Sequence, residues 1–78
     1  MIQLIVPELE TSYDVYIPIS RRIGNTIALL VKAISDMGIE YEFNNQIALY
    51  NRTNGFKYNP NSLIYDTDIR NGSILVLI

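Results

Sequence analysis

The sequence predicts an α+β domain in which one helix crosses one face of a mixed sheet of four to five strands. Short apolar or alternating runs of strand length occur in both halves of the chain. Between them lies a longer segment whose apolar residues recur at helical spacing. The chain has 78 residues, which suit one domain, so a single domain over residues 1–78 with the order β-β-α-β-β-β is expected.

An N-terminal hairpin is predicted from two runs that lie close together. Residues 2–6 form an apolar run of strand length. Residues 13–17 then alternate, as in a strand with one buried face. Pro18 has no N–H to donate, so it ends the second strand. The predicted inward residues of this strand are Tyr13, Val15 and Ile17.

Apolar residues between positions 20 and 38 recur in steps of three and four, which is typical of one helix face. Ser20 and Asn25 are both possible N-caps, and Ser20 is preferred. Gly38 suits the position just after the helix, because it readily adopts a left-handed conformation. The helix is about four turns long. Its predicted buried residues are Ile23, Ile27, Leu30, Ile34 and Met37.

The second half of the chain carries three further short strands. Residues 47–50 alternate, and residues 56–58 follow after Asn54-Gly55, a pair typical of a two-residue hairpin turn. The stretch that follows is mainly turn-like, with a few isolated apolar residues. Residues 73–78 form the last predicted strand.

Composition argues against several classes of function. The sequence has no cysteine and no histidine, so it lacks disulfides, thiolate ligands, and the commonest general base and zinc ligand. Its net charge is -2, and its six basic residues form no stripe of the kind that nucleic-acid binding requires. We therefore expect neither an enzyme nor a nucleic-acid-binding protein.

Asp66 and Asp68 lie two residues apart in a predicted turn. Two carboxylates can act as an acid/base pair or hold a cation. Aspartates in turns more commonly accept hydrogen bonds from the local backbone. With no second cluster of ligands in the sequence, the turn role is expected, and no catalytic residue, metal or cofactor is predicted.

The apolar N-terminal run stops at Pro7, which makes it too short for a secretory signal. No other run approaches the roughly 20 apolar residues that a membrane span needs. We therefore expect a cytoplasmic protein that does not insert directly into a membrane.

Two segments resemble known ubiquitin-fold proteins. Residues 63–77 (LIYDTDIRNGSILVL) resemble the leucine, aspartate, isoleucine, turn and apolar strand that end the ubiquitin-like β-grasp superfold. Residues 14–18 (DVYIP), followed by Ile23 and Leu30, resemble the YukD/EsaB-like family of small bacterial proteins associated with type VII (WXG100, ESX-like) secretion. The resemblance spans the chain and implies a non-conjugated accessory or regulatory component of such a system.

The alternative is a ubiquitin-like modifier or sulfur carrier, which would need a flexible Gly-Gly tail. This sequence instead ends in Val76-Leu77-Ile78, bulky residues that we expect to be hydrogen-bonded in the sheet. Conjugation chemistry is therefore disfavoured, and the alternative requires that such a tail is missing from the sequence.

The strongest functional prediction concerns the sheet face without the helix. In a β-grasp fold the first and last strands are the central, adjacent, parallel pair, and here both are apolar on both sides. Such strands normally belong to sheets covered on both faces, yet the sequence predicts only one helix. The predicted inward residues are Ile2, Leu4, Val6, Leu75 and Leu77.

The outward residues therefore form a predicted partner-binding surface, because contiguous exposed apolar area usually marks an interaction site. The partner is a different protein or a second copy of the chain, and ubiquitin uses the same face for recognition. In the alternative interpretation, the flanking tyrosines fold over the patch and no partner is needed. The predicted partner-binding residues are Ile5, Tyr16, Ala48, Tyr50, Ile74, Val76 and Ile78.

Overall fold

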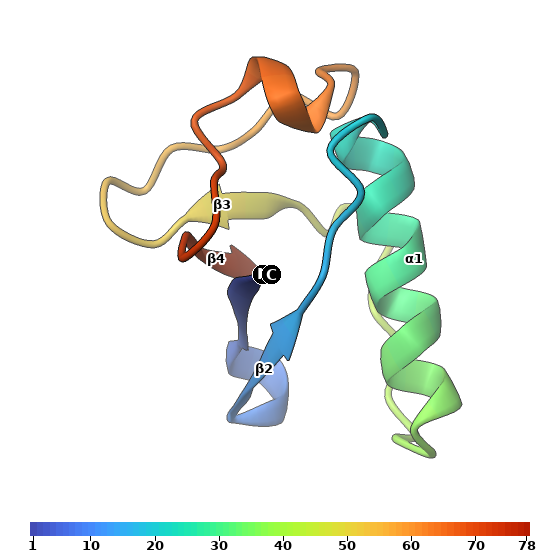
Figure 1. The fold of residues 1–78 in the computed structure, drawn as a ribbon. Coiled ribbons are helices and arrows are strands. Elements are labelled where there is room, and N and C mark those ends of the chain that lie inside the picture. Colours follow the sequence, from blue (N-terminus) through green and yellow to red (C-terminus); the bar gives the residue numbers. More distant parts are fainter.

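Four strands form one mixed sheet in the computed structural model, which describes residues 1–78. β1 (Ile2–Val6) and β4 (Ile74–Leu77) are parallel neighbours at its centre. β2 (Thr11–Val15) pairs with β1 and β3 (Leu49–Asn51) pairs with β4, both antiparallel. The single helix, α1 (Ile23–Asp36), runs beside the sheet (Figure 1). The predicted α+β class is confirmed, and the strand order β2-β1-β4-β3 fits a β-grasp-like layout.

The N-terminal hairpin differs from the prediction at its second strand, which spans residues 11–15 and not 13–17. The register explains the shift. Val15 pairs with Ile2, so β1 has no strand residue left to pair with Tyr16. A 3-10 turn, η1 (Pro7–Leu9), joins the two strands and ends at Glu10, whose φ of 51° is left-handed. This turn places Thr11 opposite Val6.

The outer edge of β2 is unpaired. Gln3 donates its backbone N–H to Ser73 O (2.9 Å). The backbone N–H and C=O groups of alternate β1 residues, Gln3 among them, therefore point toward β4, and those of the residues between them point toward β2. Ser12 and Asp14, which lie opposite β4-facing residues, therefore direct their backbone groups away from the sheet. Both residues are exposed. The carboxylate of Asp14 is thus carried on a free strand edge.

α1 begins at Ile23, with Arg22 as N-cap and no side-chain cap, so the predicted caps Ser20 and Asn25 are both wrong. Carbonyls from a distant loop take the place of a cap. Ile23 N–H donates to Ser62 O (2.8 Å) and Gly24 N–H to Pro60 O (2.9 Å). Two of the free donors of the first turn are thereby satisfied through tertiary structure, which no local sequence pattern reveals.

The end of α1 follows the prediction for glycine but not for methionine. Gly38 has φ of 83° and follows the C-cap residue of the helix, as expected. Met37 is the C-cap and is 56% exposed, so its predicted burial is wrong. The other apolar positions of the helix face are buried as predicted: Ile23, Ile27, Leu30 and Ile34.

The segment after β3 is a wide turn followed by an extended stretch rather than a hairpin with a fourth strand. Asn51 N–H donates to Phe56 O (2.8 Å), which closes a loop of residues 52–55 in place of the predicted two-residue turn. Residues 56–58 make only an isolated bridge, between Lys57 and Tyr50, so the predicted strand there is wrong. They still follow β3, because Tyr58 N–H donates to the β3 carbonyl of Leu49 (3.0 Å).

The core lies between α1 and the sheet. All of the predicted inward residues of the two central strands are 4% exposed or less, which confirms the predicted alternation. A second 3-10 turn, η2 (Ile64–Asp66), contributes Ile64 to this core. Tyr13, Val15 and Ile17 pack against it while remaining partly exposed. The core residues are Ile2, Leu4, Val6, Ile23, Ile27, Leu30, Ile34, Leu49, Tyr58, Ile64, Ile69, Leu75 and Leu77.

Candidate partner-binding surface

One cross-strand row dominates the sheet face that α1 leaves open. Ile5 of β1 lies opposite Val76 of β4, and Val76 lies opposite Tyr50 of β3. All three are partly exposed. Their strand neighbours, such as Leu4 and Leu75, are buried in the core, so the row points to the other face.

Two further residues of β4 and its extension share this face. Ile74 lies opposite Gln3 and is partly exposed. Ile78 is 47% exposed and exchanges two backbone hydrogen bonds with Ala48 (2.8 and 3.1 Å). The expected pairing of the last residue into the sheet is therefore confirmed. We call the resulting apolar surface the outer patch; it consists of Ile5, Tyr50, Ile74, Val76 and Ile78.

Polar residues border the outer patch on both sides. Ser12 lies opposite Ile5 and accepts a long hydrogen bond from the Gln3 side chain (3.5 Å). At the other end of the row, Lys57 bridges to Tyr50. Because the next residue, Tyr58, is buried in the core, Lys57 lies on the outer face. An apolar centre with a polar rim is the usual anatomy of a protein interface.

Two of the predicted partner-binding residues do not join the outer patch. Ala48 is only 6% exposed, although it lies outside the core cluster, so it offers no accessible surface. Tyr16 is 80% exposed but lies four residues beyond Ser12, which is about 13 Å along a strand from the row that contains Ile5. Tyr16 instead lines a groove beside α1 together with Leu29. The predicted surface is therefore smaller than the sequence indicated.

A polar cluster lies near the core, and it corrects the expectation for the two aspartates. The Tyr58 hydroxyl donates to Asp68 Oδ1 (2.7 Å), and Asn51 Nδ2 donates to both the Tyr58 hydroxyl (3.2 Å) and Asp68 Oδ2 (3.3 Å). Asp68 thus bonds distant side chains rather than the local backbone. Asp66 accepts no hydrogen bond from the chain. The cluster joins β3 to the segment before β4.

The tyrosine of this cluster, Tyr58, has a raised pKa. Burial is the main cause that raises the pKa of Tyr58 to about 12, and the hydrogen bond to the Asp68 carboxylate adds to it. The nearby negative charge of Asp68 also opposes ionisation of the phenol, while the bond from Asn51 acts in the opposite direction. Tyr58 is therefore a neutral donor throughout the physiological range, which suits a structural role.

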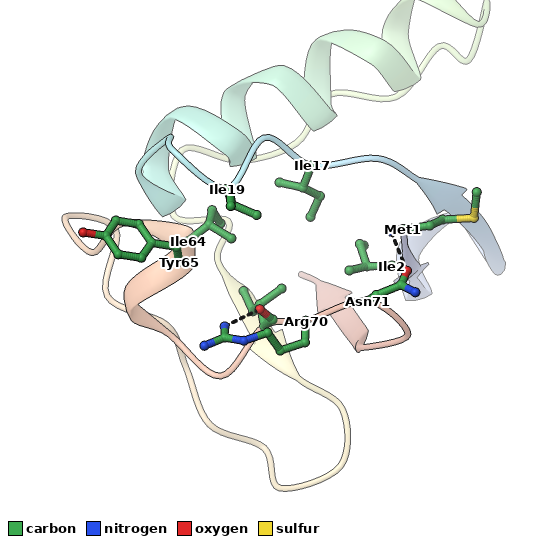
Figure 2. Close-up of a pocket in the computed structure, with 9 residues that line it drawn as sticks. Met1, Ile2, Ile17, Ile19, Ile64, Tyr65, Arg70 and Asn71 are labelled. Carbon is green, nitrogen blue, oxygen red and sulfur yellow. Dashed lines mark hydrogen bonds between the residues drawn. The ribbon is translucent and has the colours of Figure 1, made fainter.

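A second surface feature, at the end of the sheet where β1 and β4 begin, was not predicted from the sequence. It is a hollow of about 320 Å³, which we call the end hollow (Figure 2). Its rim includes the exposed residues Ile19 (64%) and Tyr65 (55%). The sequence offered one sign of this hollow: Ile19 and Tyr65 are large apolar residues that belong to none of the predicted strands or helix faces. The lining residues are Met1, Ile2, Ile17, Ile19, Ile64, Tyr65, Ile69, Arg70 and Asn71.

No group of three or more His, Cys, Asp or Glu residues is arranged to hold a metal ion. α1 is the only α-helix, and no helix has the length and apolar character that crossing a membrane requires.

Comparison with known proteins adds no relative. No protein-family model matches the chain, and no curated protein matches it. The likeness to the β-grasp fold therefore stands on the order of the elements and the topology of the sheet.

Proposed function

We propose that the chain is a protein-interaction module that binds a protein partner through the outer patch. The observation that carries this proposal is the row formed by Ile5, Val76 and Tyr50 across three neighbouring strands. The two central strands place apolar side chains on both faces, but the helix covers only one of them. A partner protein that covers the second face would remove this apolar area from water.

The composition supports binding rather than catalysis. The chain has neither histidine nor cysteine, the side chains that most often act as general base or thiol nucleophile near neutral pH. In the polar cluster, the side chains of Tyr58, Asn51 and Asp68 form hydrogen bonds with one another, so the cluster leaves no free acid or base for catalysis.

A more specific role is supported by resemblance alone. Residues 14–18 and 63–77 resemble the YukD/EsaB-like proteins of bacterial type VII secretion. On this basis we propose a non-conjugated, cytoplasmic accessory or regulatory component of such a system. Its partner would be a component or substrate of the secretion machine.

Affinity capture of the tagged chain from its own cell tests the proposal. We expect recovery of a membrane-embedded secretion ATPase or of WXG100-type proteins, and loss of these partners with Val76→Asp. Ala28→Asp is the matched control, because it adds the same charge at an exposed position on α1. Recovery of an activating enzyme of the ubiquitin-conjugation type, or equal recovery with both variants, would contradict the proposal.

A further inference from the structure

The end hollow is formed where two connections, one from β2 to α1 and one from β3 to β4, meet the start of β1. Ile17 and Ile19 come from the segment between β2 and α1, Ile64 from η2, and Ile69 from the turn before β4. Figure 2 shows the side chains of Ile17, Ile19 and Ile2 pointing toward the hollow. Its deeper residues are core residues, since Ile2, Ile64 and Ile69 are each 4% exposed or less.

Hydrogen bonds tie together the segments that form the walls of the end hollow. Tyr65 N–H donates to Ile19 O (3.1 Å), which ties η2 to the segment before α1. Across the hollow, Gly72 N–H donates to Met1 O (2.8 Å), and Arg70 N–H donates to Ser73 Oγ (2.9 Å). These bonds fix the segments that carry the lining residues, so the shape of the hollow is preorganised before an occupant binds.

Arg70 is the one charged side chain that lines the end hollow. Its Nη1 donates to the carbonyl oxygens of Thr67 and Ile69 (both 2.7 Å), which fixes the guanidinium at the edge (Figure 2). The Nη2 and Nε donors have no partner in the chain, and the only ion pair in the structure is Lys32–Asp36 on α1. A guanidinium with free donors is well suited to bind a carboxylate.

We propose that the end hollow binds a segment of a partner protein in which a bulky apolar residue lies next to an Asp or Glu. The apolar side chain enters the hollow between Ile17, Ile19 and Ile64, and the neighbouring carboxylate pairs with Arg70. At about 320 Å³, the hollow is at the lower end of the roughly 300–1,000 Å³ typical of small-molecule sites. That size suits one or two side chains better than a cofactor.

This surface is separate from the outer patch. None of the five outer-patch residues lines the end hollow. A partner can therefore be lost through one surface while the other remains intact, and the inference stands or falls independently of the proposed function.

Nuclear magnetic resonance titration with three blocked peptides tests the inference on the intact chain. The probes are acetyl-Leu-Asp-Leu-amide, its Asn analogue without the charge, and acetyl-Ala-Asp-Ala-amide without the bulky apolar groups. We expect the first peptide, at millimolar concentration, to shift the amide signals of Ile19, Tyr65 and Arg70. Loss of the charge-assisted pair should weaken binding about tenfold for the Asn peptide, and the Ala peptide should not bind.

Two variants and a control make the test specific. Arg70→Gln should bind the Asp and Asn peptides equally weakly, and Ile19→Ser should lose the first peptide while its exposed position spares the fold. Arg52→Gln, the same change at another exposed arginine outside the hollow, should bind as the wild type does. Equal affinity of the wild type for the Asp and Asn peptides, absence of binding, or shifts confined to the outer patch would overturn the inference.

Discussion

The hydroxyl of Tyr58 gives a prediction whose size follows from its contacts. Tyr58→Phe removes a bond to a carboxylate at 2.7 Å and a bond from Asn51 at 3.2 Å. A hydrogen bond to a charged group contributes about 1.5–3 kcal/mol to stability. Asp68 is exposed and regains water in the variant, so we expect the lower value, about 1.5 kcal/mol. For a domain of this size, that loss lowers Tm by about 6–12 °C.

The same cluster predicts a pH dependence. The folded pKa of Tyr58 is raised to about 12 from its ordinary value of 10.0, so the folded chain keeps a proton that the unfolded chain releases. This contribution to stability is complete below pH 10 and is lost as the pH rises toward 12. Tyr58→Phe should therefore flatten the decline of unfolding free energy across that window.

Absorbance of tyrosinate at 295 nm provides the assay. The wild type should show a late ionisation phase near pH 12, and Tyr58→Phe should lack it. Asp68→Asn should move that phase to lower pH, because it removes the charge while it leaves an acceptor for the hydroxyl. A Tyr58→Phe titration that keeps the late phase, or an unchanged Tm, would refute the structural role assigned to this hydroxyl.

Three further predictions concern the two faces of β4, the glycine turn before it and the free edge of β2. Leu75→Ala should cost about 2–5 kcal/mol in urea unfolding because Leu75 is fully buried, whereas Val76→Ala should cost about 1 kcal/mol or less because Val76 is partly exposed; equal costs would contradict the assigned faces of β4. Gly72→Ala should lower stability by roughly 1–3 kcal/mol through its φ of 91° alone, since a Cβ there meets nothing within 4 Å; an unchanged urea midpoint would contradict this. Asp14→Val should promote self-association in sedimentation. When two copies of the chain pair through their free β2 edges, the wild type brings two Asp14 carboxylates together, and the variant removes this repulsion. A strictly monomeric variant would contradict that reasoning.

The parts of the fold that local patterns determine were predictable from the sequence. Alternation in residues 2–6 and 73–78 correctly identified the inward residues of both central strands. Spacing of three and four identified the buried face of α1 as far as Ile34. Gly38 marked the helix end, because its left-handed φ is a local requirement.

Features that depend on tertiary contacts were not predictable. The start of α1 is set by carbonyls of Pro60 and Ser62, which no nearby residue announces. The extent of β2 is set by the length of β1, so Tyr16 falls outside the sheet although it continues the alternating pattern. Ala48 lies two residues before the outward-facing Tyr50, so alternation predicts that it is exposed, yet it is buried.

The candidate site was predicted in its centre and not at its margins. The row of Ile5, Val76 and Tyr50 depends on alternation, which the sequence pattern supplied, and on strand order, which the resemblance to the β-grasp fold implied. The end hollow required knowledge of how the loops around residues 17–19 and 64–71 meet in space. Loop packing of this kind depends on backbone hydrogen bonds between distant residues, which leave no periodic signal.

The affinity of the captured partner for Val76→Asp and for Ala28→Asp, measured side by side, tests the central claim most directly. A carboxylate in the middle of the outer patch should weaken binding by about 30-fold or more, the loss of about 2 kcal/mol expected at the centre of an interface. The same charge on α1 should leave the dissociation constant within about twofold. Equal affinities for the two variants, with both folded, would show that the partner does not bind the helix-free face of the sheet.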